Sequence, residues 1–217
     1  MAEITLMSDP EVAAVPVRDR GERLVDVRSE GGLLVDSLVA DAEGAYALLR
    51  EGVLRRLVKA QESLPDGLRL LFVEGYRPLS LQRHYFEEYT AELRAADPTR
   101  SPGDLHAAAS RYVSPPDIAP HSAGAAVDLT LADADGTPRD MGTPVNASPE
   151  ESAGACYTHA DGIGAEAREN RRLLGAVLTD AGLVNYPTEW WHWSYGDRYW
   201  ALATGAEHAL YGPWQGD

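Results

Sequence analysis

The chain has 217 residues, of which 44% are hydrophobic, so it is long enough to bury a core and too apolar to be disordered. Its formal net charge of −15 and pI of about 4.7 argue against nucleic acid and anionic membranes as partners, because an acidic surface repels both. Its lone cysteine, Cys156, excludes an internal disulfide, and we expect it to be a small packed residue rather than a nucleophile or a metal ligand.

The sequence also carries expectations about location and organisation. Met1–Glu11 has no cationic stretch followed by an apolar run, and no apolar run reaches the roughly 18 residues of a membrane span. We therefore expect no signal peptide, no transmembrane helix and a cytoplasmic location. The length suits a single domain over residues 1–217, whereas the oligomeric state is left open.

The first half of the chain combines predicted helices with one buried strand. Apolar residues at helical spacing predict a helix over Asp41–Leu64, which a proline and a glycine end. The apolar run Leu68–Glu74 predicts a buried strand, and a second helix follows over Leu79–Ala96. Ser101 and Pro102 are typical of a helix start and predict a shorter helix that runs to Tyr112.

The second half adds strands around one long helix. A strand is predicted over Ala125–Leu131, and the Gly-, Pro- and Asp-rich segment Ala132–Tyr157 predicts a long surface loop. A helix is predicted over Glu166–Ala181, closed by Gly182. Three further strands are predicted at Leu183–Tyr186, Trp190–Tyr195 and, after a tight turn, Arg198–Leu202. This order favours an α+β fold with a mainly antiparallel central sheet flanked by helices.

Two short segments hold the residue types of a hydrolytic zinc site. His121 and Asp128 lie in the first segment, and Glu189 and His192 lie in the second. Hydrolytic zinc takes three ligands from His, Asp or Glu and keeps one position for a water molecule, whose pKa falls toward ~7. A separate carboxylate must take a proton from that water and return it to the leaving amine. The four residues are the minimum set for this chemistry, and they suit one zinc per chain.

The spacing of these residues sets a structural requirement. Residues seven apart in a regular strand face opposite sides, so the first segment cannot be extended throughout, and Gly124 is the residue that lets the backbone turn. Glu189 and His192 are three positions apart, so in a regular strand they would also face opposite sides. We therefore expect a bulge or a turn at Trp190 or Trp191. The aromatic residues of this segment either form a water-poor wall or pack in the core.

Arg77 is a third candidate. It follows the predicted buried strand and lies between Gly75 and Pro78, which restrict the backbone. A guanidinium at this place can stabilise a tetrahedral oxyanion or pair with a substrate carboxylate, and the alternative is a structural ion pair. We assign no role to the remaining histidines, although His159 lies near the long loop; they are His84, His106, His159 and His208.

These residues lie in four motifs through which the sequence resembles the VanX-type D-alanyl-D-alanine dipeptidases of the M15 zinc peptidases. The resemblance spans about residues 70–200 and keeps the family's motif order. The motifs are Glu-Gly-Tyr-Arg-Pro at 74–78, His-Ser-x-Gly-x-Ala-x-Asp at 121–128, Asp-Met-Gly-Thr-Pro at 140–144 and Glu-Trp-Trp-His at 189–192.

The resemblance implies specific roles for these residues. His121, Asp128 and His192 would bind zinc, Glu189 would be the general base and acid, and Arg77 would stabilise the oxyanion. The implied fold is the compact α+β fold of D,D-carboxypeptidases and the Hedgehog signalling domain. The implied reaction is hydrolysis of D-alanyl-D-alanine with free ends, inside the cell. The candidate substrate-binding residues are Tyr76, Ser122, Asn146 and Trp191.

The resemblance breaks after Thr143. The family usually has an aromatic residue and an aspartate where this chain has Val145 and Asn146. If that aspartate helps to hold the substrate ammonium, Asn146 weakens the charge contact. The candidate substitutes are Glu150, Glu151 and Asp161.

Two alternatives stay open beside the dipeptidase. One is a carboxypeptidase or endopeptidase that trims peptidoglycan stem peptides. Cleavage of N-blocked peptides at full rate would support this alternative. The other is a non-catalytic binding protein that keeps the zinc. Glu189 argues against the second alternative, because a binding module needs no residue to transfer protons.

Overall fold

A five-stranded sheet runs through the centre of the computed structural model, in the strand order β2-β4-β5-β7-β6. The structure describes residues 4–216, so residues 1–3, which belong to the segment tested for a signal peptide, and residue 217 lie outside it. β2, which the sequence did not predict, pairs with β4 in parallel, and the other neighbours are antiparallel, so the sheet is mainly antiparallel as predicted. The strands are β2 (Leu34–Val35), β4 (Leu68–Glu74), β5 (Ala126–Asp133), β6 (Val184–Asn185) and β7 (His192–Ser194).

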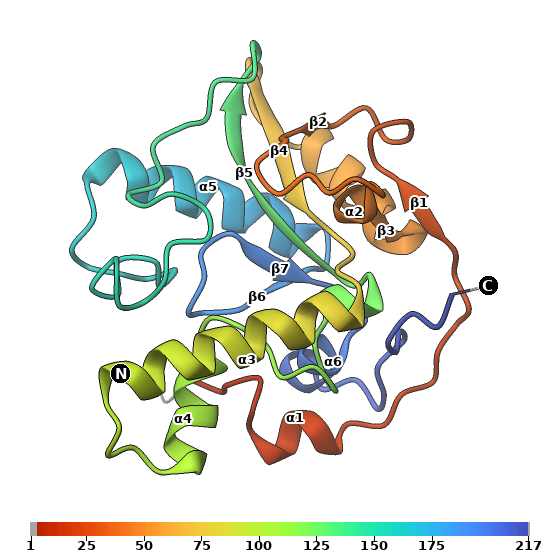
Figure 1. Cartoon of the computed structure of the whole chain (residues 1–217). Helices are drawn as coiled ribbons and strands as arrows, with labels where there is room; N and C mark the ends of the chain where they lie inside the picture. The colour runs from red at the N-terminus through yellow and green to blue at the C-terminus, as the bar shows by residue number, and fades with distance from the viewer. Residues whose placement is uncertain (1–3, 217) are drawn as a thin grey trace.

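Helices flank this sheet, which confirms the predicted α+β class. In Figure 1, α2 and α5 lie behind the sheet, whereas α3 crosses in front of the lower ends of the strands. α2 packs against α5, α3 against α4, and α1 against α6. The helices are α1 (Pro10–Ala14), α2 (Glu51–Glu62), α3 (Leu79–Ala96), α4 (Pro102–Ala109), α5 (Ala165–Asp180) and α6 (Arg198–Thr204).

The helix predicted over Asp41–Leu64 is wrong in its first part. A 3₁₀ helix, η1 (Ala45–Ala47), and a strand, β3 (Leu48–Arg50), come before α2. β3 pairs with β1 (Leu24–Asp26) in a separate two-stranded sheet, so the buried Leu49 reaches the core from a strand and not from a helix face. Helical spacing of apolar residues therefore does not distinguish a helix from a short strand that leads into one.

The strand predicted over Arg198–Leu202 is also wrong, because these residues lie in α6. The Asp197 side chain accepts hydrogen bonds from the backbone N–H groups of Tyr199 and Trp200 and so caps the helix. Other predictions are confirmed: β4 and α3 have the predicted bounds, and the Ser101 hydroxyl accepts from the Asp104 N–H as the cap of α4.

The core lies between the sheet and the pair α2 and α5, where Leu57, Phe72, Leu129 and Leu174 are among the buried residues. After β5, the predicted loop crosses the molecule without a helix or a strand of its own up to Tyr157. The loop is not confined to the surface, because Met141 and Cys156 are buried, the latter as the predicted small packed residue.

Between residues 4 and 216, no helix combines the length and the apolar character that crossing a bilayer requires. The expectation of one domain over residues 1–217 stays a prediction.

Candidate metal centre and active site

Three neighbouring strands place polar residues in one row across the sheet. Asp128 on β5 is paired with Glu74 on β4 and with His192 on β7. Paired residues on adjacent strands point to the same face, so the three side chains project together. A register shift between Phe72 and Glu74 brings Glu74 into this row. All three side chains are buried, with relative exposures of 3–5%.

His121 reaches the row from a turn and not from a strand. It begins the 3₁₀ helix η2 (His121–Ala123), after which Gly124 adopts a left-handed φ of 64°. A Cβ at this glycine would lie 2.5 Å from Cδ2 of Leu24. The predicted turn at Gly124 is thus present. The His121 Nδ1–H donates to the Gly75 carbonyl at 2.6 Å, and this leaves the lone pair of Nε2 to face the row.

Three ligand-type atoms converge at this point. His121 Nε2 lies 3.1 Å from His192 Nδ1 and 3.3 Å from Asp128 Oδ1, and His192 Nδ1 lies 3.0 Å from the same oxygen. The cluster satisfies the spacing of a metal site, because all three atoms lie within 4.8 Å of one another. Two imidazoles and a carboxylate are a donor set that zinc accepts. The three residues therefore fit the ion.

The charge state of the cluster also suits a cation. Burial alone would raise the pKa of Asp128, but His121 and His192 outweigh it and hold that pKa far below its usual value. Burial lowers the pKa of His192, which favours the neutral imidazole that metals bind. A buried carboxylate and a neutral imidazole thus present lone pairs to the same place.

Glu189 lies beside the cluster because the chain turns at Trp190 and Trp191, as the spacing predicted. Its Oε2 lies 3.7 Å from His192 Nδ1, and the side chain is buried. Burial raises the pKa of Glu189 well above its usual value, and the negative charge of Asp128 raises it further. Both tryptophans are buried in the core, which favours the packing interpretation of the aromatic residues.

Arg77 forms the structural ion pair that the sequence left open. Its Nε and Nη2 donate to the two carboxylate oxygens of Glu74 at 2.7 and 2.5 Å, and Nη1 donates to Gln82 Oε1 at 2.9 Å. Burial lowers the pKa of Arg77, but Glu74 outweighs this and holds the pKa above its usual value. Guanidinium has five N–H donors, so the three engaged here leave two for a ligand.

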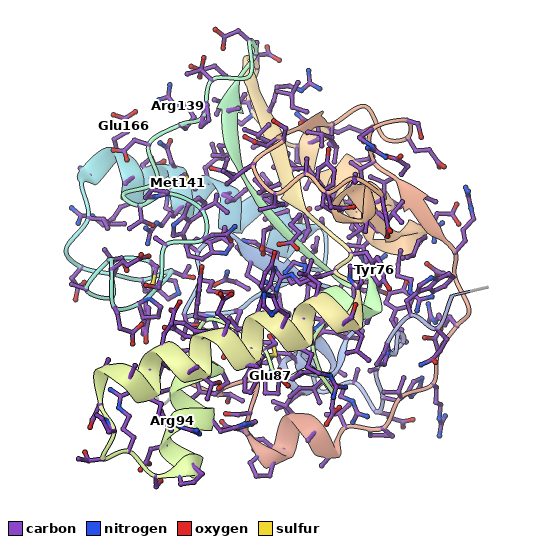
Figure 2. All side chains as sticks on the ribbon, viewed as in Figure 1. Tyr76, Glu87, Arg94, Arg139, Met141 and Glu166 are labelled. Carbon is purple, nitrogen blue, oxygen red and sulfur yellow. The ribbon has the colours of Figure 1, made fainter. Side chains whose placement is uncertain are left out.

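A cavity of about 350 Å³ opens onto the cluster. Its lining includes Glu189, Arg77 and, of the predicted substrate-binding residues, Asn146. Tyr76, Ser122 and Trp191 are not among its lining residues. Tyr76 lies between the end of β4 and the start of α3, as Figure 2 shows. The Ser122 hydroxyl donates to the Arg77 carbonyl and so supports the backbone at that residue.

Several lining residues were not candidates in the sequence; the polar ones include Glu74, Gln82, Glu88, Glu92, Tyr112 and Ser148. Glu74 was visible only as part of a motif, and its place emerges from the strand register. Tyr112 donates its hydroxyl to the Asn146 carbonyl at 2.8 Å, which fixes the loop at the cavity wall.

Of the three acids considered as substitutes at the departure, Glu151 lines the cavity, whereas Glu150 accepts a hydrogen bond from Tyr89. Asp161 and His159 border a different hollow near the N-terminal segment.

Comparison with known proteins places this geometry in a family. The Peptidase_M15 family, described as D-ala-D-ala dipeptidase, matches residues 34–208. A D-alanyl-D-alanine dipeptidase of Synechocystis sp. is 31% identical, over 90% of this chain and 90% of that protein. One of Escherichia coli K12 is 29% identical, over 68% of this chain and 66% of that protein.

Among solved structures, VanYB in complex with D-alanine-D-alanine matches with a TM-score of 0.50 and 18% identity, over 91% of this chain and 94% of that chain. This likeness confirms the predicted D,D-peptidase fold. The chain belongs to the M15 family of D-ala-D-ala dipeptidases and is a zinc metallopeptidase.

Proposed function

We propose that this chain hydrolyses D-alanyl-D-alanine, or a closely related small dipeptide with free termini. The observation that carries the proposal is the convergence of His121, Asp128 and His192 beside Glu189 in one cavity. The choice of substrate is supported by the family, described as D-ala-D-ala dipeptidase, and by the similar D-alanyl-D-alanine dipeptidases of Synechocystis sp. and Escherichia coli K12. The cavity volume of about 350 Å³ suits a small ligand.

In this proposal, His121, Asp128 and His192 hold one zinc ion. When bound, zinc would act as a Lewis acid that polarises a carbonyl and makes hydroxide available near neutral pH. The hydrogen bond from His121 to the Gly75 carbonyl fixes the tautomer and the ring orientation that this role needs.

Glu189 is the general base and acid of the proposed reaction. It takes a proton from the attacking water and returns it to the leaving amine, while the amide bond of the dipeptide breaks. Burial raises the pKa of Glu189 above its usual value, and the negative charge of Asp128 raises it further, so the protonated form is a better proton donor to the leaving amine than an exposed carboxylic acid would be.

Arg77 is the proposed oxyanion donor. Arg77 lines the cavity that the metal ligands also line, two of its N–H groups are not engaged by Glu74 or Gln82, and Glu74 keeps the guanidinium charged. Because Glu74 and Gln82 orient the guanidinium before substrate arrives, little reorganisation is needed as negative charge develops on the carbonyl oxygen.

The test separates chemistry from metal binding. We expect Glu189→Gln to keep about one zinc per chain by elemental analysis and to lose about 10²-fold or more in kcat for D-alanyl-D-alanine. Chelation of the wild-type protein should abolish turnover, and added zinc should restore it. An active Glu189→Gln enzyme would contradict the assigned role, and an inactive zinc-loaded wild type would contradict the proposed reaction.

Location and domain organisation belong to the same proposal. We place the reaction in the cytoplasm, in keeping with a small free dipeptide as substrate and with a single buried cysteine. Cell fractionation tests this placement. We also propose that residues 1–217 act as one domain, because the core cluster joins residues from Val25 to Tyr211.

A further inference from the structure

Arg50, the last residue of β3, is a buried arginine outside the lining of the catalytic cavity. Its side chain is 1% exposed, and a cation taken out of water needs fixed partners. The acceptors are the carbonyls of Ala123 at 2.8 Å, Glu22 at 2.5 Å and Gly212 at 3.2 Å, and the Asp19 carboxylate at 3.1 Å. Three of these four acceptors are backbone carbonyls, so the guanidinium fixes the course of the chain more than it neutralises an acid.

The first of these carbonyls belongs to η2, the turn that carries His121. Each carbonyl of η2 accepts a hydrogen bond from a residue outside the turn. These bonds join the Arg77 N–H to the His121 carbonyl at 3.2 Å, the Trp214 N–H to the Ser122 carbonyl at 2.8 Å, and Arg50 Nε to the Ala123 carbonyl at 2.8 Å. A single 3₁₀ turn makes few hydrogen bonds of its own, so these external donors set its orientation.

The segment that ends at Arg50 also supports the imidazole of His121. The ring donates to the Gly75 carbonyl. The N–H groups of Gly75 and of the residue after it donate to the carbonyls of Tyr46 and Leu48 at 2.7 and 2.6 Å. Both the backbone and the ring of His121 are therefore held by residues 46–50.

The other partners of Arg50 come from the two terminal segments. Residues 18–20 bind residues 209–210 through backbone hydrogen bonds, and Figure 1 shows the two segments on the same side of the molecule. The Arg50 guanidinium lies 4.6 Å from the centroid of the Trp214 ring, within the range of a cation–π contact. These partners all lie outside residues 34–208, which match the family; they are Asp19, Glu22, Gly212 and Trp214. Through Arg50, both terminal segments are attached to the turn of a proposed metal ligand.

We propose that Arg50 and Trp214 are positioning residues of the metal centre, and that the terminal segments set its zinc affinity through the turn of His121. This inference rests on the proposed function, in which His121 is a ligand. An imidazole that is held in place before the ion arrives loses little freedom on binding, so a loosened turn lowers the affinity. Once His121 is bound to the ion, that bond itself holds the ring, so excess zinc compensates for a loosened turn.

The test measures the zinc Kd with a competing chelator and without substrate. Arg50→Lys keeps the positive charge but replaces a planar fork of donors by one ammonium, which cannot span the same carbonyls. Arg55→Lys, at an exposed residue of α2, is the matched control. Trp214→Pro removes the N–H that the Ser122 carbonyl accepts, whereas Trp214→Ala removes the ring and keeps that N–H.

We expect Arg50→Lys and Trp214→Pro to raise the zinc Kd about 10- to 100-fold, the usual effect of losing a group that orients a metal ligand. Trp214→Ala should raise the Kd less than Trp214→Pro, and Arg55→Lys should bind zinc as the wild type does. Added zinc should restore most of the turnover that the first two variants lose. Lower stability with an unchanged zinc Kd would mean a merely structural role and would overturn the proposal. Because Trp214 is only half-buried, its two variants decide the outcome if Arg50→Lys does not fold.

A double-mutant cycle shows whether the effect passes through His121. In a His121→Ala background, Arg50→Lys should not lower the residual zinc affinity further, because the ligand that it positions is gone. An equal loss of affinity in both backgrounds would overturn the proposal. If the wild type binds zinc no more tightly than His121→Ala does, the proposed metal centre fails. If those two differ while Arg50→Lys and Trp214→Pro leave the Kd unchanged, the metal centre stands and the inference fails.

Discussion

Arg171 on α5 holds the long segment after β5 in place, and its removal should destabilise the protein. The side chain is 5% exposed and donates three hydrogen bonds to backbone carbonyls of that segment. The acceptors are Met141 at 2.8 Å, Tyr157 at 2.7 Å and Ala155 at 2.9 Å. Figure 2 shows Met141 where the segment passes α5. Burial lowers the pKa of Arg171 to about 10, so it stays charged at neutral pH.

The expected cost of Arg171→Met follows from these bonds. Methionine keeps most of the apolar stem but donates nothing, so three carbonyls lose a charged donor. At about 1.5 kcal/mol for each hydrogen bond to a charged group, the loss is ~4.5 kcal/mol. The carbonyls of Ala155 and Tyr157 belong to half-buried residues, and water can hydrate them in part. We therefore expect the free energy of unfolding to fall by about 3 kcal/mol.

The neighbouring residue provides a matched control. Arg172 is exposed and, among residues 4–216, forms its ion pair with Glu169 on its own helix, so Arg172→Met should cost no more than about 0.5 kcal/mol. Urea denaturation monitored by tryptophan fluorescence gives both values. Equal destabilisation by the two substitutions would refute the reasoning. Because Asn146, Ser148 and Glu151 lie on the same segment, Arg171→Met should also raise KM for the dipeptide.

Three further substitutions test other parts of the structure. Arg77→Ala should lower kcat on the order of 10²- to 10³-fold without loss of zinc, and an unchanged kcat in steady-state assays would reject the oxyanion role. Gly124→Ala should lower the free energy of unfolding by at least about 2 kcal/mol in a urea titration, because the new Cβ would lie 2.5 Å from Leu24 and alanine disfavours the left-handed backbone of this position. The same substitution in a Leu24→Ala background should cost less, and an equal cost there would rule out the clash. Asp197→Ala should cost about 1–2 kcal/mol by thermal melting, because α6 loses its cap; an unchanged melting temperature would show that the cap contributes nothing.

The part of the fold that the sequence predicted well is the part with long, uninterrupted patterns. Leu68–Glu74 and Leu79–Ala96 were predicted with the bounds that β4 and α3 have, because apolar runs and a helical stripe of this length have few competing interpretations. Arg198–Leu202 failed because a five-residue stretch is compatible with both a strand and a helix. The capping bonds of Asp197 decide that choice, and they depend on the fold around it.

The short segments Leu24–Asp26 and Leu48–Arg50 show a second limit. They form a strand pair, β1 and β3, that no local sequence pattern predicted. The apolar residue Leu49 fits a helical stripe with the residues after it, yet it lies in a strand, pairs with Val25 and is buried in the main core cluster. Pairing between distant segments is a tertiary effect, and it overrides local propensity when the segment is short.

The candidate site was predictable where its residues lie in short sequence motifs and are of types that bind metals or transfer protons. His121, Asp128, Glu189 and His192 could be named from residue type and spacing, together with the turns that their spacing requires, and the structure contains those turns. Arg77, Asn146 and Glu151 were also candidates, whereas Glu88 and Glu92 on α3 and Ser148 in the segment after β5 were not, because no motif marks them. That segment is fixed by side chains such as Arg171 and Tyr112, whose partners are backbone carbonyls with no sequence signature.

Glu74 belongs to the site because of strand pairing and not because of its position along the chain. Along the chain it is 54 positions from Asp128, and a regular ladder from Phe72 would not align them. The register shift after Phe72 moves Glu74 opposite Asp128, and the same shift lets its carboxylate meet Arg77 three residues later. The irregularity therefore has a chemical consequence: it neutralises part of the Arg77 charge while fixing the guanidinium at the cavity. An arginine held in this way can respond to charge that develops on a bound carbonyl, yet it attracts a free carboxylate less strongly than an unbound arginine would.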